Sequence, residues 1–427
     1  MKKIRATKIR VLFLIITLFG LNSVLSGCWS AHEINKLSIV NVIGIDETDS
    51  GELKVTTVIV KPTDLFAESS FGGGNPIHSP FLIQSVTGNS MFEIMEKLSD
   101  SVSEKVYLGH LNAIVFGQDI AKNRMKDCLD FFKRQIDFRP NIKVLVTKES
   151  AERIVKQRPN FNATLGLELQ ELIRSSQFAT SRVVTDISQF TQKLSENTED
   201  PITGVISTDE AMTDIQTDKE DVTTQGKVNH KGNKSDKTTE DSESLGMQGT
   251  AVFKGEHLVG YLDTEETQGL LLLKGDLDSS IITLNCGKKD KGTVGLQVNH
   301  SESTFKPSFT NGEPKMDITI SVDANIGDYT CKHATISSQK ISQLEDQFEK
   351  VLQQQVQDVL YVTQKDWQTD SIGFGKVLYH KYPDQWKRLE PSWRNGGLKQ
   401  MGVSVKIDAN IKRFGLTKEA IKVNESR

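Results

Sequence analysis

Residues 111–147 read LNAIVFGQDIAKNRMKDCLDFFKRQIDFRPNIKVLVT and combine two strand patterns with one helix pattern. LNAIVFG, residues 111–117, is a short apolar run typical of a buried strand, and NIKVLVT, residues 141–147, alternates in the manner of a strand. Between them, apolar residues recur on one helix face: Ala121, Met125, Cys128, Leu129 and Phe132. This order predicts two parallel strands joined by a right-handed crossover.

The sequence on either side of this unit alternates strands and helices in no regular order. Upstream, residues 37–60 predict two strands with a turn at 49–51, and Ser90 is placed to cap a helix. Further elements are predicted downstream: helices at 154–178 and 187–194, a hairpin turned at 254–256, a helix from Asp263 to Leu273, strands at 281–286, 293–305 and 315–323, a core-facing helix at 338–364, a helix or turn near 374–389 and a strand at 403–411. The pattern predicts an α+β protein of several domains, with mixed β-sheets flanked by helices.

One acidic segment interrupts this pattern. Residues 195–246 contain 13 acidic and 5 basic residues and no aromatic residue. Such a composition buries too little apolar area to offset the entropy of ordering the chain. We therefore expect a disordered acidic linker at 195–246. It separates an N-terminal domain at 28–194, built as one unit or as two subdomains, from a C-terminal α+β domain at 247–427.

The N-terminus has the three parts of a lipoprotein signal peptide. Five basic residues precede the apolar run VLFLIITLFG at 11–20, and Leu25-Ser26-Gly27-Cys28 follows it. The small residues before Cys28 fit a signal peptidase, and the thiol is the group that lipoprotein maturation acylates. We expect residues 1–27 to be removed and Cys28 to carry S-diacylglycerol and an N-acyl chain such as palmitate, which anchors the protein to a membrane. The alternative is an uncleaved anchor with an incidental cysteine.

Charge and hydropathy exclude several classes of protein. Nothing after the N-terminal run approaches the roughly 20 consecutive apolar residues of a membrane helix, which excludes a polytopic transporter. Removing residues 1–27 takes away five basic groups and moves the formal charge from −4 to −9, of which the acidic segment supplies −8. The remaining sequence is nearly neutral, so we expect no binding to nucleic acid.

Common catalytic motifs are absent from the sequence. It lacks H-E-x-x-H, G-x-S-x-G and a P-loop with its lysine. No two of the eight histidines, at positions 32, 78, 110, 230, 257, 300, 333 and 380, lie within four residues of each other. Metal-ligand spacing is therefore unsupported. We expect a protein that is not an enzyme and that uses no cofactor or metal.

The remaining cysteines carry weaker signals. Cys128 lies on the apolar face of its predicted helix and is expected to be inert packing. Cys286 and Cys331 are able to pair in an oxidising compartment, although their predicted strand and loop positions do not require it. Their pairing stays open at this point.

An aromatic cluster stands near the C-terminus. Residues 371–393 read SIGFGKVLYHKYPDQWKRLEPSW and hold two Trp, two Tyr and one Phe, in a chain that is 7% aromatic. Exposed, these side chains would form a recognition surface or a sugar platform. Because Trp386 and Trp393 are seven residues apart and share one side of a helix, we favour their burial in the C-terminal core.

Five segments resemble, in the same order, the Ger(x)C lipoproteins, the C subunits of nutrient germinant receptors in spore-forming bacteria. The segments are GCWSAHEINKLSIVNVIGID (27–46), YLGHLNAIVFG (107–117), FFKRQIDFRPNIKVLVT (131–147), DSIGFGKVLYHKYPDQWKRLEPSW (370–393) and VSVKIDANIKRFG (403–415). The most specific features are the lipobox at Cys28, the R-x-x-D-x-R run of Arg134, Asp137 and Arg139, and the GFG…W…W stretch. Together they span nearly the whole mature chain.

This resemblance implies a location, partners and a role. The protein would sit on the outer face of the inner spore membrane, beside the A and B subunits, which are integral membrane proteins. The B subunit is the family's usual candidate for the nutrient pocket, so the resemblance implies a non-catalytic subunit needed for receptor assembly and for signalling germination. The long acidic segment and Ser30, where the family often has an acidic residue, depart from the family pattern.

Other hypotheses remain open. A solute-binding lipoprotein of an importer would need two similar α/β lobes, and a cell-wall hydrolase would need paired carboxylates or metal ligands. Neither pattern is found in the sequence. For Arg134, Asp137 and Arg139, charge pairing that fixes the turn from helix to strand is the structural interpretation, and a docking point for another receptor subunit is the functional one.

Overall fold

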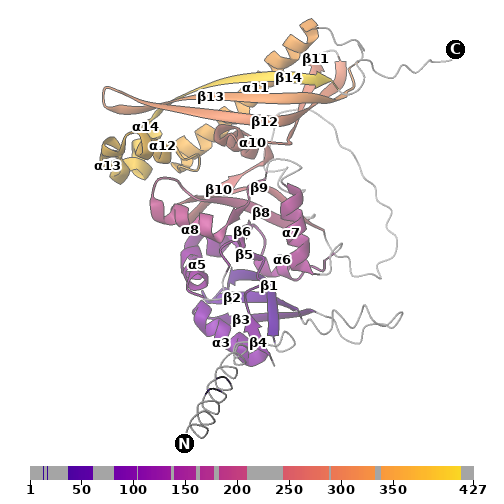
Figure 1. The fold of residues 1–427 in the computed structure, drawn as a ribbon, viewed down its shortest axis with the longest axis vertical. Helices are drawn as coiled ribbons and strands as arrows, with labels where there is room; N and C mark the ends of the chain where they lie inside the picture. Colours follow the sequence, from indigo (N-terminus) through magenta and orange to yellow (C-terminus); the bar gives the residue numbers. More distant parts are fainter. Residues whose placement is uncertain are drawn as a thin grey trace, which may run out of the picture.

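The computed structural model describes residues 13, 17, 37–60, 81–102, 104–135, 139–159, 164–176, 182–208, 244–287, 290–331 and 338–414. Cys28, Asp137 and residues 209–243 of the predicted linker lie outside these ranges. The described residues form two β-sheets with helices packed against them (Figure 1). The predicted class, α+β with mixed sheets flanked by helices, is confirmed.

The larger sheet has ten strands and a parallel centre. Its order is β10-β9-β8-β6-β5-β1-β2-β3, with β4 beside β1 and β7 beside β6. Strands β1, β5, β6 and β8 are parallel, whereas β2 and β3 at one edge and β9 and β10 at the other are antiparallel. The bounds are β1 Leu37–Glu47, β2 Leu53–Val60, β3 Phe81–Gly88, β4 Lys105–Tyr107, β5 Ala113–Gly117, β6 Lys143–Thr147, β7 Thr185–Asp186, β8 Ile202–Thr208, β9 Leu245–Lys254 and β10 His257–Leu262. The predicted parallel pair is the pair β5 and β6.

Helices cover both faces of this sheet. In β5, Ile114 and Phe116 join the core beneath one group of helices, and Ala113 and Val115 join the core on the other face. Strands buried on both faces read as continuous apolar runs, as LNAIVFG does. The helices of the first face are α3 Met91–Ser101, α4 Gln118–Asn123, α5 Met125–Lys133 and α8 Ile187–Glu196, and those of the second are α6 Ala151–Val155 and α7 Leu165–Ser176.

The smaller sheet has four long strands and one buried face. Its order is β11-β12-β13-β14, with bounds Ile281–Gly287, Asp290–Thr310, Glu313–Tyr329 and Gly402–Phe414. Strands β12 and β13 form a hairpin through Asn311 and Gly312, whose φ angles of 54° and 90° suit a two-residue hairpin turn. In β13, alternate residues from 316 to 324 are buried and the residues between them are not.

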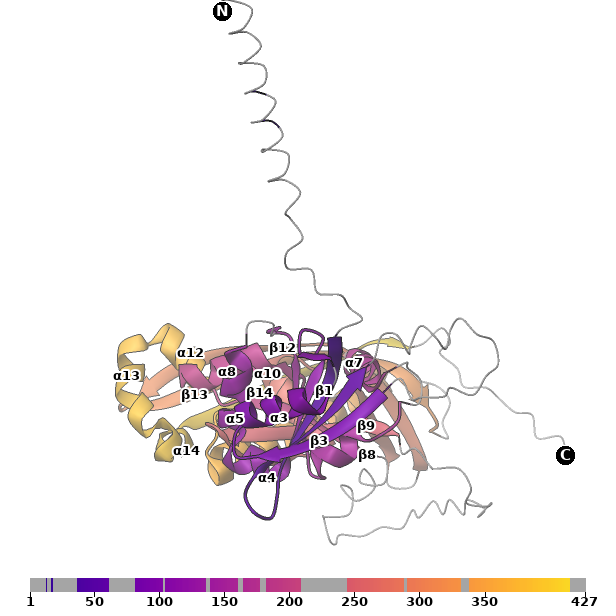
Figure 2. The same ribbon diagram turned by 90° about the horizontal axis from the view of Figure 1, so that it is seen from below.

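The buried face of the smaller sheet packs against C-terminal helices (Figures 1 and 2). The long helix α11 places one apolar stripe in this core, as predicted: Leu344, Phe348, Leu352, Val356 and Val359. The elements are α10 Thr264–Lys274, α11 Ser338–Leu360, the π-helical turn η2 Tyr361–Trp367, α12 Phe374–Lys381, α13 Pro383–Ser392, η3 Trp393–Gly397 and α14 Leu398–Gln400. No helix in the described ranges has the length and apolar character needed to span a bilayer.

Two predicted boundaries are wrong, and one predicted hairpin belongs to the other sheet. The predicted linker at 195–246 begins too early, because residues 202–208 form β8, which is buried throughout. Its sequence ITGVIST carries Thr, Ser and Gly among its apolar residues, and it therefore resembles a polar segment. The hairpin of β9 and β10, assigned to a C-terminal domain at 247–427, instead pairs with β8 and completes the larger sheet. The helix predicted at 154–178 is two helices, since residues 157–159 are not helical and end at a proline.

Candidate functional site

A buried polar cluster joins the two halves of the chain where the larger sheet meets the C-terminal helices. We call it the junction cluster. Two carboxylates come from the segment before β8. A third carboxylate and a hydroxyl come from the loop between η2 and α12, and an indole and a guanidinium come from η3. Its members are Glu199, Asp200, Thr369, Asp370, Trp393 and Arg394.

Asp370 is the centre of this cluster. Its Oδ1 accepts hydrogen bonds from the backbone N–H groups of Gly373 (2.9 Å) and Phe374 (2.8 Å). Its Oδ2 accepts from the N–H of Gly375 (2.6 Å) and from the indole Nε1 of Trp393 (2.9 Å). The side chain therefore ties the first turn of α12 to η3. Burial raises the pKa of Asp370 to about 6, although these donors act to lower it.

Asp200 links three separate segments. Its Oδ1 accepts from the N–H of Gly255, in the turn between β9 and β10, and forms an ion pair with Arg394 at 2.8 Å. Its Oδ2 accepts from the N–H of Asp370 (2.8 Å) and from the hydroxyl of Thr369 (3.2 Å). The backbone N–H of Asp200 in turn donates to the carbonyl of Asp370 (2.9 Å). Removal of this carboxylate would leave buried donors without acceptors.

Glu199 is shared by two lysines. Its Oε1 accepts from the ammonium groups of Lys193 in α8 (2.7 Å) and Lys274 in α10 (2.8 Å). Lys274 also donates to the carbonyls of Ser371 (3.2 Å) and Ile372 (3.3 Å). Burial acts to raise the pKa of Glu199, but Lys274 and Lys193 hold it below its ordinary value. One carboxylate thus connects α8, α10 and the loop before α12.

Close packing around the cluster explains the aromatic and glycine pattern of residues 370–393. Trp386 and Trp393 are 2% and 1% exposed and stack edge to face with centroids 5.3 Å apart, so their predicted burial is confirmed. A Cβ at Gly375 would lie 2.5 Å from the Trp386 ring and 2.7 Å from the carbonyl of Thr198. The third residue of the GFG motif therefore admits no side chain without a shift of its neighbours.

The geometry makes the junction cluster a structural clamp. Asp200 and Asp370 are 0% and 1% exposed, and all four carboxylate oxygens accept hydrogen bonds from the same chain. A general acid or base must reach a reacting group on a substrate. These carboxylates reach only the chain that folds around them.

The structure brings together few of the residues that the sequence singled out. Cys28 and Asp137 lie outside the described residues. Arg134 is exposed and pairs with Asp130 at 2.8 Å, one helical turn earlier, and Arg139 is exposed. Cys128 is buried and free, and burial raises the pKa of its thiol to about 12, in keeping with inert packing.

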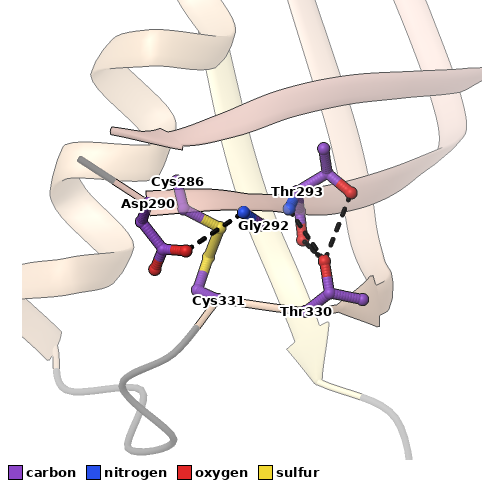
Figure 3. The surroundings of a disulfide bond; sticks show 6 residues. All are labelled: Cys286, Asp290, Gly292, Thr293, Thr330 and Cys331. Atoms are coloured by element: carbon purple, nitrogen blue, oxygen red, sulfur yellow. Dashed lines mark hydrogen bonds between the residues drawn. A yellow bond between two sulfur atoms is a disulfide. The ribbon is translucent and has the colours of Figure 1, made fainter. Parts of the chain in front are cut away.

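Cys286 and Cys331 form a disulfide, which settles the pairing that the sequence left open. Their Cα atoms are 5.6 Å apart and join the end of β11 to the residues after β13 (Figure 3). Beside them, Asp290 accepts a hydrogen bond from the N–H of Gly292, and Thr293 and Thr330 bond to each other (Figure 3). Within the described ranges, these two sulfurs and Asp290 are the one group of three close potential metal ligands. Because the sulfurs are bonded to each other, they offer no thiolate ligand.

The sequence analysis missed Glu199 and Asp200 because it assigned them to the linker. The segment TEDP at 198–201 is charged and lies directly before the acidic stretch, so its composition resembles that stretch. A usable signal was present in DSIGFG at 370–375. Aspartate side chains commonly accept hydrogen bonds from backbone N–H groups a few residues further along the chain, and the glycines here leave room for the chain to turn back onto the carboxylate.

The fold and the junction cluster define a mixed α/β protein of two sheets, held together by a buried clamp of carboxylates and cations. Residues 30–208 match the family described as spore germination protein N-terminal domain, and residues 248–415 match the family described as spore germination B3/GerAC like, C-terminal. The chain belongs to this family of spore germination proteins.

Individual relatives match over nearly their full length. Spore germination protein KC of Bacillus subtilis (strain 168) is 28% identical and covers 93% of this chain and 95% of the relative. Spore germination protein GerQC of Bacillus cereus is 21% identical, covering 95% and 99%. The crystal structure of the GerBC protein superposes with a TM-score of 0.54 at 17% identity, covering 86% of this chain and 96% of that chain. This last likeness is one of fold.

Proposed function

We propose that this chain is a lipid-anchored, non-catalytic subunit of a spore nutrient germinant receptor, required for receptor assembly and for signalling germination. In this proposal Cys28 carries S-diacylglycerol and an N-acyl chain and holds the protein on the outer face of the inner spore membrane. Its partners are the A and B integral membrane subunits of the receptor.

The observation that carries the proposal is the colinear match with spore germination proteins over more than nine-tenths of the chain. Two features support it. The lipobox LSGC at 25–28 provides an anchor, and the buried carboxylates of the junction cluster serve the fold rather than a substrate. The alternative of an importer's solute-binding lipoprotein is disfavoured, because one sheet has ten strands and the other four, whereas such proteins have two similar lobes.

Co-purification from detergent-solubilised spore membranes tests the proposed partners. An affinity tag at the C-terminus of this chain should recover two integral membrane subunits of a receptor. Recovery of an ATPase and a permease instead would support the importer hypothesis. Arg139→Ala tests the docking role, since Arg139 is exposed. Arg174→Ala is the matched control, because Arg174 is an exposed arginine on α7, outside the candidate docking run. Loss of partners in the first variant alone would favour docking through Arg139.

Fatty-acid labelling tests the anchor separately. A clickable fatty-acid analogue should label the wild-type chain and leave Cys28→Ala unlabelled, and the variant should be released from its membrane site or retained only by an uncleaved signal. Equal labelling of both chains would refute lipidation at Cys28. This result is independent of the partner experiment, so each part of the proposal can fail alone.

A further inference from the structure

A cavity of about 490 Å³ lies next to the junction cluster, between elements of both halves. Helix α8 comes from the N-terminal half, and α10 and α12 pack on the smaller sheet; both views place the three helices side by side (Figures 1 and 2). Four cationic side chains line the cavity: Arg182, Lys193, Lys274 and Lys376. Its apolar lining includes Val183, Ile202 and Leu271, which belong to the core of the C-terminal half.

Three carboxylates lie near these four cations, which leaves a net positive charge of one. Lys193 and Lys274 share the single carboxylate of Glu199. Across the ranges that the structure describes, Arg182 and Lys376 form no ion pair. Two further carboxylates line the cavity, those of Glu196 and Asp276. Glu196 accepts a hydrogen bond from the side chain of Gln192 (2.5 Å), and both acidic residues are exposed.

The apolar part of the cavity lining strengthens the electrostatic interactions of the four cations. An apolar wall lowers the local dielectric constant, so charges facing the cavity interact more strongly than charges in water. Burial and the nearby charge of Lys274 lower the pKa of Lys193, and Lys376 adds to this effect. Burial lowers the pKa of Arg182. The protonated forms are thus held close together at an energetic cost that a bound anion would relieve.

We propose that this cavity binds a small oxyanion that carries phosphate or carboxylate groups. Its volume suits a small metabolite. The guanidinium of Arg182 is suited to bidentate contact with such groups, and the lysines supply point charges. Because α8, α10 and α12 all contribute, the bound anion bridges the two halves beside the Glu199 ion pairs. This inference does not depend on the proposed receptor function.

Calorimetric titration of the full-length protein in detergent tests the inference, with pyrophosphate and citrate as the two probes. We expect saturable binding of at least one probe, and the comparison of the two distinguishes phosphate from carboxylate recognition. Arg182→Ala and Lys376→Ala should each weaken binding about five- to tenfold, whereas Lys376→Arg should retain it. Glu196→Gln removes a negative charge from the lining and should tighten binding.

Lys387→Ala is the matched control, because Lys387 is an exposed lysine on α13 outside this cavity. Its affinity for either probe should equal that of the wild type. Absence of saturable binding for both probes, or unchanged affinity in Arg182→Ala and Lys376→Ala, would overturn the proposal. If Arg182→Ala does not fold, the charge reversal Lys376→Glu decides the question, since that side chain is exposed.

Discussion

The two sheets of this protein bury their strands in different ways. In β5 of the larger sheet, neighbouring residues such as Ile114 and Val115 are both 0% exposed, because helices cover both faces. In β13 of the smaller sheet, Ile320 is 0% exposed while its neighbour Ser321 faces outward. The larger sheet therefore packs against a hydrophobic core on each of its faces, and the smaller sheet on one face.

The sheet with one buried face is the one that carries additional covalent and polar links. The smaller sheet gains a disulfide at Cys286 and Cys331, which constrains a loop with a sequence separation of 45 residues. Its helices are fixed to the larger sheet through buried charged groups, Asp200, Asp370 and Glu199, rather than through apolar packing alone. Buried polar groups stabilise only when every partner is present, so the junction cluster should be the most sensitive part of the fold.

The largest effect is expected for Asp370→Ala. The substitution leaves three backbone N–H groups and the Trp393 indole without their acceptor in a buried site. Each buried donor left without an acceptor costs about 1–3 kcal/mol in the free energy of unfolding. Chemical denaturation followed by circular dichroism measures this cost.

Asp384→Ala is the control for that measurement. Asp384 lies in α13 of the same region, but its side chain is 84% exposed. Its removal should change the free energy of unfolding by less than about 0.5 kcal/mol. Equal effects for the two aspartates would show that the junction cluster does not hold the halves together.

The next largest effect is a pH dependence of the free energy of unfolding, which comes from Asp370 in the junction cluster. Burial raises the pKa of Asp370 to about 6 in the folded protein, against about 3.9 in the unfolded chain. The folded state therefore binds more protons between these values, and stability should fall as pH rises from about 4 to 6 and level off above. The full contribution is about 3 kcal/mol.

Asp370→Asn separates this contribution from other titrations. Burial also raises the pKa of Asp46, which lies in the larger sheet and remains in both proteins. The pH slope between 4 and 6 should therefore be shallower in the variant by the contribution of Asp370 alone. Identical slopes for both proteins would mean that the carboxylate does not titrate in this range.

Alanine substitutions at neighbouring positions measure how differently the two sheets bury their residues. Ile114→Ala and Val115→Ala should both destabilise, by about 3 and about 2 kcal/mol, because each deletes buried methyl groups on its own face. Ile320→Ala should also cost about 3 kcal/mol, whereas Ser321→Ala should cost less than about 0.5 kcal/mol. A large cost at Ser321 would show that the outer face of the smaller sheet is covered.

Sequence reasoning succeeded where the signal is local and failed where it is long-range. The β5 and β6 pair, the α11 stripe and the buried Trp386 and Trp393 follow from periodicity and spacing. The junction cluster does not, because Asp200 and Asp370 are 170 residues apart and only the fold places them together. Strand β8 was missed for a related reason: its burial comes from its neighbours β6 and β9, not from its own hydrophobicity.

The smallest effect is expected from shortening the acidic segment that connects β8 to β9. Thr208 pairs with Leu245, so the ends of this connection are already adjacent in the sheet. Deleting residues 218–235 halves the 36-residue connection at 209–244, which should raise the free energy of unfolding by only about 0.6 kcal/mol through reduced closure entropy. Replacing the same residues with a Gly/Ser sequence of equal length should leave stability unchanged if the segment is the unstructured linker that its composition predicts. A loss of more than about 1 kcal/mol in either variant would mean that the acidic segment packs against the sheets, and that the two halves share a third contact besides the hairpin of β9 and β10 and the junction cluster.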